Sequence, residues 1–184
     1  MPNLSRSAHK APEYARQNFY TWLLVFFEAA AVLAILFLLA LIPAKVNGSS
    51  MSPTLLDGEV LLVDRVSMYV RMPQRGEIIT FAHPQTGEEL IKRVIGMPGE
   101  TVEITGGHVY VNGRLLDESS YINAEVPADF PATVVPWESV FVLGDDRAAS
   151  TDSRDPAVGC VALNRIDGTV RLRVSPLTRA SLFL

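Results

Sequence analysis

A single apolar run near the N-terminus constrains this chain of 184 residues more than any other feature. From Phe19 to Ile42 the only charged residue is Glu28. A helix that crosses a bilayer needs about 20 mainly apolar residues, and this run supplies them. Tyr20 and Trp22 stand at its start, where amphipathic rings favour the membrane interface, and Pro43 is expected to end it. The sequence therefore predicts a transmembrane helix over residues 19–42.

The cations on either side of this run predict its orientation. Arg6, Lys10 and Arg16 precede it, whereas Lys45 is the nearby cation that follows. By the positive-inside rule, residues 1–18 are then a cytoplasmic segment and residues 43–184 an extracytoplasmic domain. A cleaved signal peptide is the main alternative. The run, however, exceeds the usual apolar core of about 7–15 residues and lacks a clear small-x-small site at its end.

Composition argues against several kinds of partner. The formal net charge is -4 and no segment is strongly basic, so a nucleic-acid partner is not expected. The three histidines are scattered without ligand spacing, so we expect neither a metal nor another cofactor. The single cysteine, Cys160, cannot form an internal disulfide and is expected to be a small buried hydrophobic residue. Nothing in the sequence indicates an oligomeric state.

After residue 56 the pattern changes to short apolar runs separated by turns, which is typical of strands. Gly106-Gly107 and Asn112-Gly113 are hairpin signals. Residues 117–137 are polar and contain prolines, so we expect a long loop or an edge excursion there. The fold class predicted is mainly β, an antiparallel, barrel-like domain behind one helix. Strands are predicted over residues 60–63, 78–81, 90–95, 101–105, 108–111, 140–143 and 170–174.

Several serines directly follow the predicted span. Ser49, Ser50 and Ser52 lie beside Gly48 and Pro53, on a backbone that is constrained locally. A serine is a poor nucleophile unless a nearby group takes its proton. Taken alone, the stretch can be a linker between an anchor and a domain, or a turn that carries a nucleophile.

Lys92 is the most informative charge in the chain. In a strand over residues 90–95 it shares one face with Leu90 and Val94, and both faces are apolar apart from one cation each. Such a strand is expected to be buried on both sides. Burial lowers the pKa of a lysine amine, and a neutral amine can act as a general base near neutral pH. A lysine whose stem leads its amine out to water is the alternative.

A third stretch, Gly144–Arg154, alternates acidic residues with arginines directly after a predicted apolar strand. Loops in this position often carry functional residues. Its charges could form an ion-pair network that holds Ser150 or Ser153 in place. An ordinary surface loop is the alternative.

Together, these stretches resemble type I signal peptidases, the membrane-bound serine proteases that remove signal peptides from exported proteins. The resemblance covers nearly the whole chain and places it in a bacterial plasma membrane as a single-pass protein. The segments that carry it are Gly48-Ser49-Ser50-Met51-Ser52-Pro53-Thr54-Leu55, Gly58–Val63, Arg75–Ile78, Ile91–Glu100, Val111–Gly113 with Glu118, and Gly144–Arg147 with Ser150 and Asp152–Arg154.

The resemblance implies a Ser/Lys dyad in which Ser50 is the nucleophile and Lys92 the general base. The Ser-Met-x-Pro spacing favours Ser50 over Ser49 and Ser52. The oxyanion hole would use the Ser50 backbone N–H. Some family members add a hydroxyl two residues earlier, but this chain has Gly48 there.

The resemblance also assigns supporting roles to the later loop. Ser150 would orient the Lys92 amine, and an Asp152–Arg154 pair would hold the loop. Asp145 and Arg147 would be structural supports of the site.

The substrate implied is an exported preprotein with small residues, typically Ala-x-Ala, before the cleaved bond. Alignment with the family places five residues near shallow apolar pockets: Val46, Met51, Leu61, Thr80 and Ile91. The lipid bilayer is the other partner implied.

Two departures from the family pattern concern the last loop. Asp146 replaces the usual asparagine, and the Asp155–Val158 link is longer than usual. Two other functions stay open, a self-cleaving Ser/Lys protease and a catalytically silent, membrane-tethered β domain.

Overall fold

The computed structural model describes residues 11–122 and 128–183. The chain divides into two compact units, Met1–Ala40 and Leu41–Leu184. In the first, helix α1 covers Ala11–Leu39. Within it, Asn18–Ile35 has a mean hydropathy of 1.7 and is not buried at all, so the helix is long and apolar enough to cross a membrane.

The helix ends earlier than the predicted boundary at Ile42. Strand β1 (Leu41–Lys45) begins almost at once and contains Pro43. Among the described residues, β1 is the terminal strand of its sheet and pairs with β2 alone. An edge strand tolerates proline, because an N–H on its open side has no neighbouring strand to bond. Pro43 therefore lies within an edge strand rather than at a helix end.

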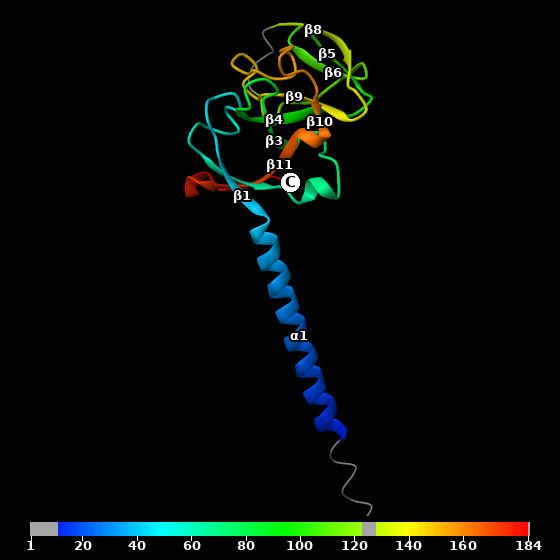
Figure 1. The fold of residues 1–184 in the computed structure, drawn as a ribbon, viewed down its shortest axis with the longest axis vertical. Helices are drawn as coiled ribbons and strands as arrows, with labels where there is room; N and C mark the ends of the chain where they lie inside the picture. Colours follow the sequence, from blue (N-terminus) through cyan, green and yellow to red (C-terminus); the bar gives the residue numbers. More distant parts are fainter. Residues whose placement is uncertain (1–10, 123–127, 184) are drawn as a thin grey trace, which may run out of the picture. The chain divides into compact units, whose positions relative to one another are not determined.

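The second unit contains two antiparallel sheets (Figure 1). The larger has the order β1-β2-β11-β3-β4-β9-β10, with β12 paired to β11. Its other strands are β2 (Val60–Asp64), β3 (Ile78–Ala82), β4 (Glu89–Gly96), β9 (Ser139–Leu143), β10 (Val161–Ala162), β11 (Ile166–Ser175) and β12 (Ser181–Leu182). Short 3-10 turns cover Ser67–Tyr69, Leu163–Arg165 and Leu177–Arg179.

The smaller sheet has the order β7-β6-β5-β8. Its strands are β5 (Thr101–Thr105), β6 (His108–Val111), β7 (Arg114–Leu115) and β8 (Phe130–Val134). Both predicted hairpins are confirmed, since Gly106-Gly107 joins β5 to β6 and Asn112-Gly113 joins β6 to β7. Asn112 has a φ of 52°, the left-handed conformation that such turns require.

The mainly antiparallel β prediction is confirmed, and each of the seven predicted strands is present. Strand β8 falls within residues 117–137, where we expected a loop or an edge excursion. It forms an edge of the smaller sheet. Residues 123–127 of that stretch lie outside the described residues. The two-residue strands were not predicted because they are too short to show a periodic pattern.

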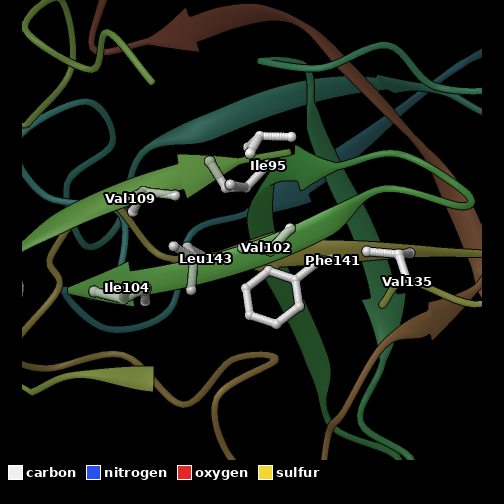
Figure 2. Close-up of a cluster of buried hydrophobic side chains, with 8 residues drawn as sticks. Ile95, Val102, Ile104, Val109, Val135, Phe141 and Leu143 are labelled. Atoms are coloured by element: carbon white, nitrogen blue, oxygen red, sulfur yellow. The ribbon is translucent and has the colours of Figure 1, made fainter. Parts of the chain in front are cut away.

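A shared apolar core joins the two sheets. Figure 2 shows its side chains, which come from β5 and β6 of the smaller sheet, from β4 and β9 of the larger, and from Val135, just after β8. Phe141 and Leu143 of β9 pack with Val102 and Ile104 of β5, and all four side chains are fully buried. Cys160 packs only at the margin of this cluster. It is half-buried rather than buried, because it directly precedes the short edge strand β10.

Strand β4 is the element that positions the site. It pairs with β3 on one side and with β9 on the other, and Ile91–Gly96 are all buried. The predicted burial of this strand on both faces is confirmed. Any charge on it must therefore find a partner inside the protein.

Candidate active site

The serines lie in a folded turn between β1 and β2, which we call the nucleophile turn (residues 46–59). Its ends are joined because Val46 N–H donates to the Glu59 carbonyl at 2.8 Å and Gly58 N–H to the Val46 carbonyl at 2.9 Å. Gly48, with a φ of +87°, donates its N–H to Asp57 Oδ1 at 2.8 Å. The stretch is therefore an ordered turn and not a flexible linker.

Two apolar side chains fix the nucleophile turn to the domain. Met51 is 1% exposed and Leu55 is fully buried, and both pack in one apolar cluster with residues of β2, β3 and β4. Leu55 N–H also donates to the Met51 carbonyl at 2.9 Å, which closes a single helical turn. Ser50, just before Met51, is held in place by this packing.

Lys92 reaches the turn from the middle of β4. Its amine donates a hydrogen bond to Ser50 Oγ at 2.6 Å, and only 2% of the residue is exposed. This burial excludes the alternative in which the Lys92 side chain extends its amine into water. Of the three serines in the turn, Ser50 is the one hydrogen-bonded to this amine among the described residues.

Burial lowers the pKa of the Lys92 amine from 10.5 to about 8. Loss of hydration is the largest cause, since it penalises the charged form. The negative charge of Asp152 opposes the shift, and the positive charge of Arg154 adds to it. A substantial fraction of the amine is consequently neutral near pH 7–8, and the neutral form can accept the Ser50 proton.

Asp145 begins the predicted support network. It accepts two hydrogen bonds from the Arg93 guanidinium, at 2.8 and 2.6 Å. Arg93 also donates to the Gly76 carbonyl and lies over the Tyr121 ring at 4.1 Å. Neither a role for Arg93 nor one for Tyr121 was predicted. The detectable signal was a second cation, Arg93, on an apolar strand.

Arg147 and Asp152 hold the same loop from within. Arg147 pairs with buried Glu118 through its two terminal guanidinium nitrogens, and its Nε donates to the Gly144 carbonyl at 3.1 Å. Asp152 accepts two hydrogen bonds from Arg154, each at 2.8 Å, and one from Gly144 N–H at 3.0 Å. The expected Asp152–Arg154 pair is thus formed, and both networks meet at Gly144.

Ser150 lies beside Ser50 and Gly144. Its Oγ is buried and makes no hydrogen bond with any residue that the structure describes, so the expected bond to Lys92 is not formed in this structure. A side chain at Gly144 would collide with Ser150 Oγ and with the Ser50 carbonyl oxygen. Glycine is therefore required where these two serines approach the end of β9. The Ser50 carbonyl is itself held by Asp146 N–H at 3.0 Å.

A pocket of about 330 Å³ opens onto the dyad. Ser50 and Lys92 lie in its wall with polar residues of the β3–β4 turn and of the later loop. The other lining residues are Asn47, Gly48, Ser49, His83, Thr86, Glu88, Leu90, Ala149 and Thr151. Among the described residues, no group of three or more histidines, cysteines and acids could hold a metal.

The residues expected near substrate pockets lie beneath the surface. Val46, Met51, Leu61 and Ile91 belong to a single apolar cluster and are at most 8% exposed. Thr80 is fully buried, and its hydroxyl has no hydrogen-bond partner in the part of the chain that the structure describes. They lie outside the wall of the dyad pocket, so their contact with a substrate stays a prediction.

Comparison with known proteins gives a consistent result. Residues 19–175 match the family described as signal peptidase, peptidase S26. The chain is 37% identical over 143 residues to a signal peptidase I of Bacillus amyloliquefaciens, covering 73% of this chain and 74% of the relative. It is 34% identical over 188 residues to a probable signal peptidase I-2 of Synechocystis, and this match covers 98% of the chain and 84% of the relative.

The chain is 36% identical in sequence to a signal peptidase I from Enterococcus faecalis whose crystal structure is known. The structural match covers 54% of this chain and 97% of that protein, with a TM-score of 0.47. The family match extends over most of the sequence and includes both Ser50 and Lys92. This chain belongs to the signal peptidase family, peptidase S26, and is a serine protease.

Proposed function

We propose that this protein cleaves signal peptides from exported preproteins with a dyad formed by Ser50 and Lys92. The observation that carries the proposal is the 2.6 Å hydrogen bond between the Lys92 amine and Ser50 Oγ in a buried setting. A base of pKa about 8 beside a hydroxyl is what an activated serine needs.

In the proposed reaction, the neutral Lys92 amine takes the proton of Ser50 as Oγ attacks the scissile carbonyl. The Ser50 backbone N–H would stabilise the oxyanion, and it donates to no other residue that the structure describes. The protonated amine then gives its proton to the leaving amine, and an acyl-enzyme forms. Neutral again, Lys92 removes a proton from the water that hydrolyses the ester, and Ser50 regains its proton from the lysine.

Ser150 is proposed to orient the Lys92 amine during this cycle. Its buried hydroxyl has no partner among the described residues, and such groups usually have one. A hydrogen bond to the Lys92 amine would satisfy this hydroxyl and hold the amine after Ser50 has become acylated. Asp145, Arg147, Asp152 and Arg154 would support the loop that carries Ser150.

The substrate proposed has small residues before the cleaved bond, typically in an Ala-x-Ala pattern. Val46, Met51, Leu61, Thr80 and Ile91 are proposed to form the floor of the sites that read these residues. Because this floor is already closely packed, it would accept a methyl group but leave no room for a longer side chain.

The proposed location is a bacterial plasma membrane, with residues 1–18 in the cytoplasm and the β domain outside. The apolar helix supports the span, and the excess of Lys and Arg before it supports the orientation. The lipid bilayer is therefore a proposed partner.

Cleavage of an Ala-x-Ala preprotein by the full-length protein tests the dyad. Ser50→Ala and Lys92→Ala are each expected to abolish cleavage, whereas Ser49→Ala is expected to retain it. The Ser49→Ala variant is a matched control, since it removes a hydroxyl from the same turn. Normal cleavage by Ser50→Ala would refute the assignment of the nucleophile.

The same variants separate the other two candidate functions. A self-cleaving protease would cut its own chain and leave the preprotein intact. A silent β domain would cleave neither, and a serine-directed acylating reagent would not label Ser50. Labelling of Ser50 that is lost in Lys92→Ala would favour the dyad.

A further inference from the structure

The nucleophile turn is held from behind by two arginines that come from the C-terminal part of the chain. Arg173, on β11, donates to the Thr54 carbonyl at 2.6 Å. Arg179, in the 3-10 turn after β11, donates to the Pro53 carbonyl at 3.1 Å. Both carbonyls belong to the same turn, three and four residues after Ser50. Hydrogen bonds from charged donors are among the stronger ones available to a carbonyl.

A buried carboxylate completes this arrangement. The side chain of Glu59 is 3% exposed and pairs with both arginines, each at 3.2 Å. Its Oε2 also accepts the N–H of Leu56 at 3.0 Å. Glu59 therefore compensates the buried positive charge and binds the nucleophile turn at the same time. We call Glu59, Arg173 and Arg179 the arginine clamp.

The clamp and the dyad act on opposite ends of one short segment. The Ser50 carbonyl is fixed by Asp146 N–H at 3.0 Å, and Ser50 Oγ is held by Lys92. Thr54 is fixed by Arg173, whose side chain is only 10% exposed. If the clamp is removed, the segment keeps its front contacts and the 3.4 Å hydrogen bond from Arg93 to Thr54 Oγ1, but it loses the donors that hold the Pro53 and Thr54 carbonyls.

We infer that Arg173 is a positioning residue that keeps Ser50 Oγ within reach of the Lys92 amine. The inference rests on the proposed function, because it gives Ser50 the role of nucleophile. Reacting groups must lie close and aligned for the attack, and a displacement of about 1 Å can cost about a hundredfold in rate. The Arg173 guanidinium does not touch the reacting atoms, so its effect acts through the backbone of the turn.

Strand β11 offers a matched control for this residue. Arg171 lies on the same strand and also binds two acids, pairing with half-buried Glu77 at 3.1 Å and with buried Asp64 at 3.5 Å. No hydrogen bond joins Arg171 to the nucleophile turn among the residues that the structure describes. Arg173→Met and Arg171→Met therefore both remove an internal ion pair, but only the first releases the turn.

Steady-state cleavage of an Ala-x-Ala peptide by the full-length variants tests the inference, with thermal unfolding measured in parallel. Both variants are expected to unfold at lower temperature than the wild type. Arg173→Met is expected to lower kcat about tenfold to a hundredfold with KM nearly unchanged. Arg171→Met is expected to keep kcat, and Arg173→Lys to recover part of the loss because an ammonium can still donate to Thr54. The acid limb of the pH–rate profile should stay in place in Arg173→Met, since Lys92 is untouched.

Equal kcat values for folded Arg173→Met and Arg171→Met would overturn the inference, as would a shifted acid limb. If Arg173→Met does not fold, Arg179→Met gives the same test, because its side chain is 34% exposed and it still contacts the turn. An unchanged kcat in that variant would then count against the clamp. Ser50→Ala separates the two levels of argument. Cleavage by Ser50→Ala refutes the dyad itself, whereas an inactive Ser50→Ala with a normal Arg173→Met refutes the clamp alone.

Discussion

Replacing Lys92 by methionine should make the protein more stable while it abolishes catalysis. The lysine is 2% exposed, so its charged form is buried with little access to water. Methionine has a similar length and no charge, so it can fill the same space without needing hydration. The residue that we propose as the general base is thus expected to lower the stability of the fold, as is common where function sets a group's environment.

The size of the effect follows from the pKa of the amine. Its fall from 10.5 to about 8 corresponds to about 3 kcal/mol, at about 1.4 kcal/mol per unit. This is the amount by which burial of the charged Lys92 lowers the free energy of unfolding near pH 7. Loss of the hydrogen bond to Ser50 offsets about 1 kcal/mol of the gain. Lys92→Met is therefore expected to be about 2 kcal/mol more stable than the wild type.

The pH dependence of this difference has a definite sign. The folded-state pKa of Lys92 lies below the unfolded value, so between these two values the unfolded chain binds more protons and wild-type stability rises with pH. The penalty is fully present below about pH 8 and disappears as the pH approaches 10.5. The advantage of Lys92→Met should shrink over the same range. Above it, the wild type should be the more stable protein, because it keeps the bond to Ser50.

Thermal unfolding of the detergent-solubilised full-length proteins, followed by near-ultraviolet circular dichroism, measures the difference. A gain of about 2 kcal/mol corresponds to a Tm higher by about 4–8 °C for a domain of this size. Lys45→Met is the matched control, since Lys45 is exposed on β1 and its replacement removes no buried charge. A Tm of Lys92→Met below that of the wild type near pH 7, or a difference that does not change with pH, would refute the reasoning.

Three further predictions concern the same site. The kcat/KM for a peptide substrate is expected to fall about tenfold per unit of pH below about 8, because only the neutral Lys92 amine accepts a proton; a flat profile there would contradict the role of this base. Gly144→Ala is expected to lower cleavage at least about tenfold and stability by about 1–3 kcal/mol, because its methyl group would collide with the Ser50 carbonyl; wild-type activity and Tm would count against this. Asp145→Asn is expected to cost about 3–5 kcal/mol in urea unfolding, because it leaves Arg93 buried without its counter-charge, and a loss under about 1 kcal/mol would show that water reaches this pair.

The local pattern of the sequence predicted the helix and seven of the strands, but not β1, β8 or the two-residue strands. The apolar run predicted a helix because length and hydropathy are properties of consecutive residues. The strands and both glycine-bearing hairpins were predicted for a similar reason, since alternation and turn chemistry act over a few residues. Lys92 stood out because a cation in an apolar strand is unusual. The helix end was placed too late because Pro43, read as a helix terminator, lies in an edge strand instead.

The resemblance to the family added a preference for Ser50 among the serines, which the residues of the turn taken alone left open. It did not predict that Ser150 Oγ would lack a partner, or that Arg93 and Asp145 would form a bidentate pair. Those features depend on how loops pack after the strands have paired. The sequence does not show which partner a hydroxyl or a guanidinium will bind in the folded protein.

Only the tertiary structure decided how the site is assembled. Lys92 contacts Ser50 across a separation of 42 residues, and Arg93 contacts Asp145 across 52 residues. Arg173 contacts Thr54 across 119 residues. Each depends on the strand order of the larger sheet, in which β11 lies between β2 and β3, and β4 lies between β3 and β9. Local sequence determines whether a segment becomes a strand. The order in which strands pair is decided by the burial of all their faces at once. This order brings the turn that carries Ser50 together with Lys92 and with the arginine clamp.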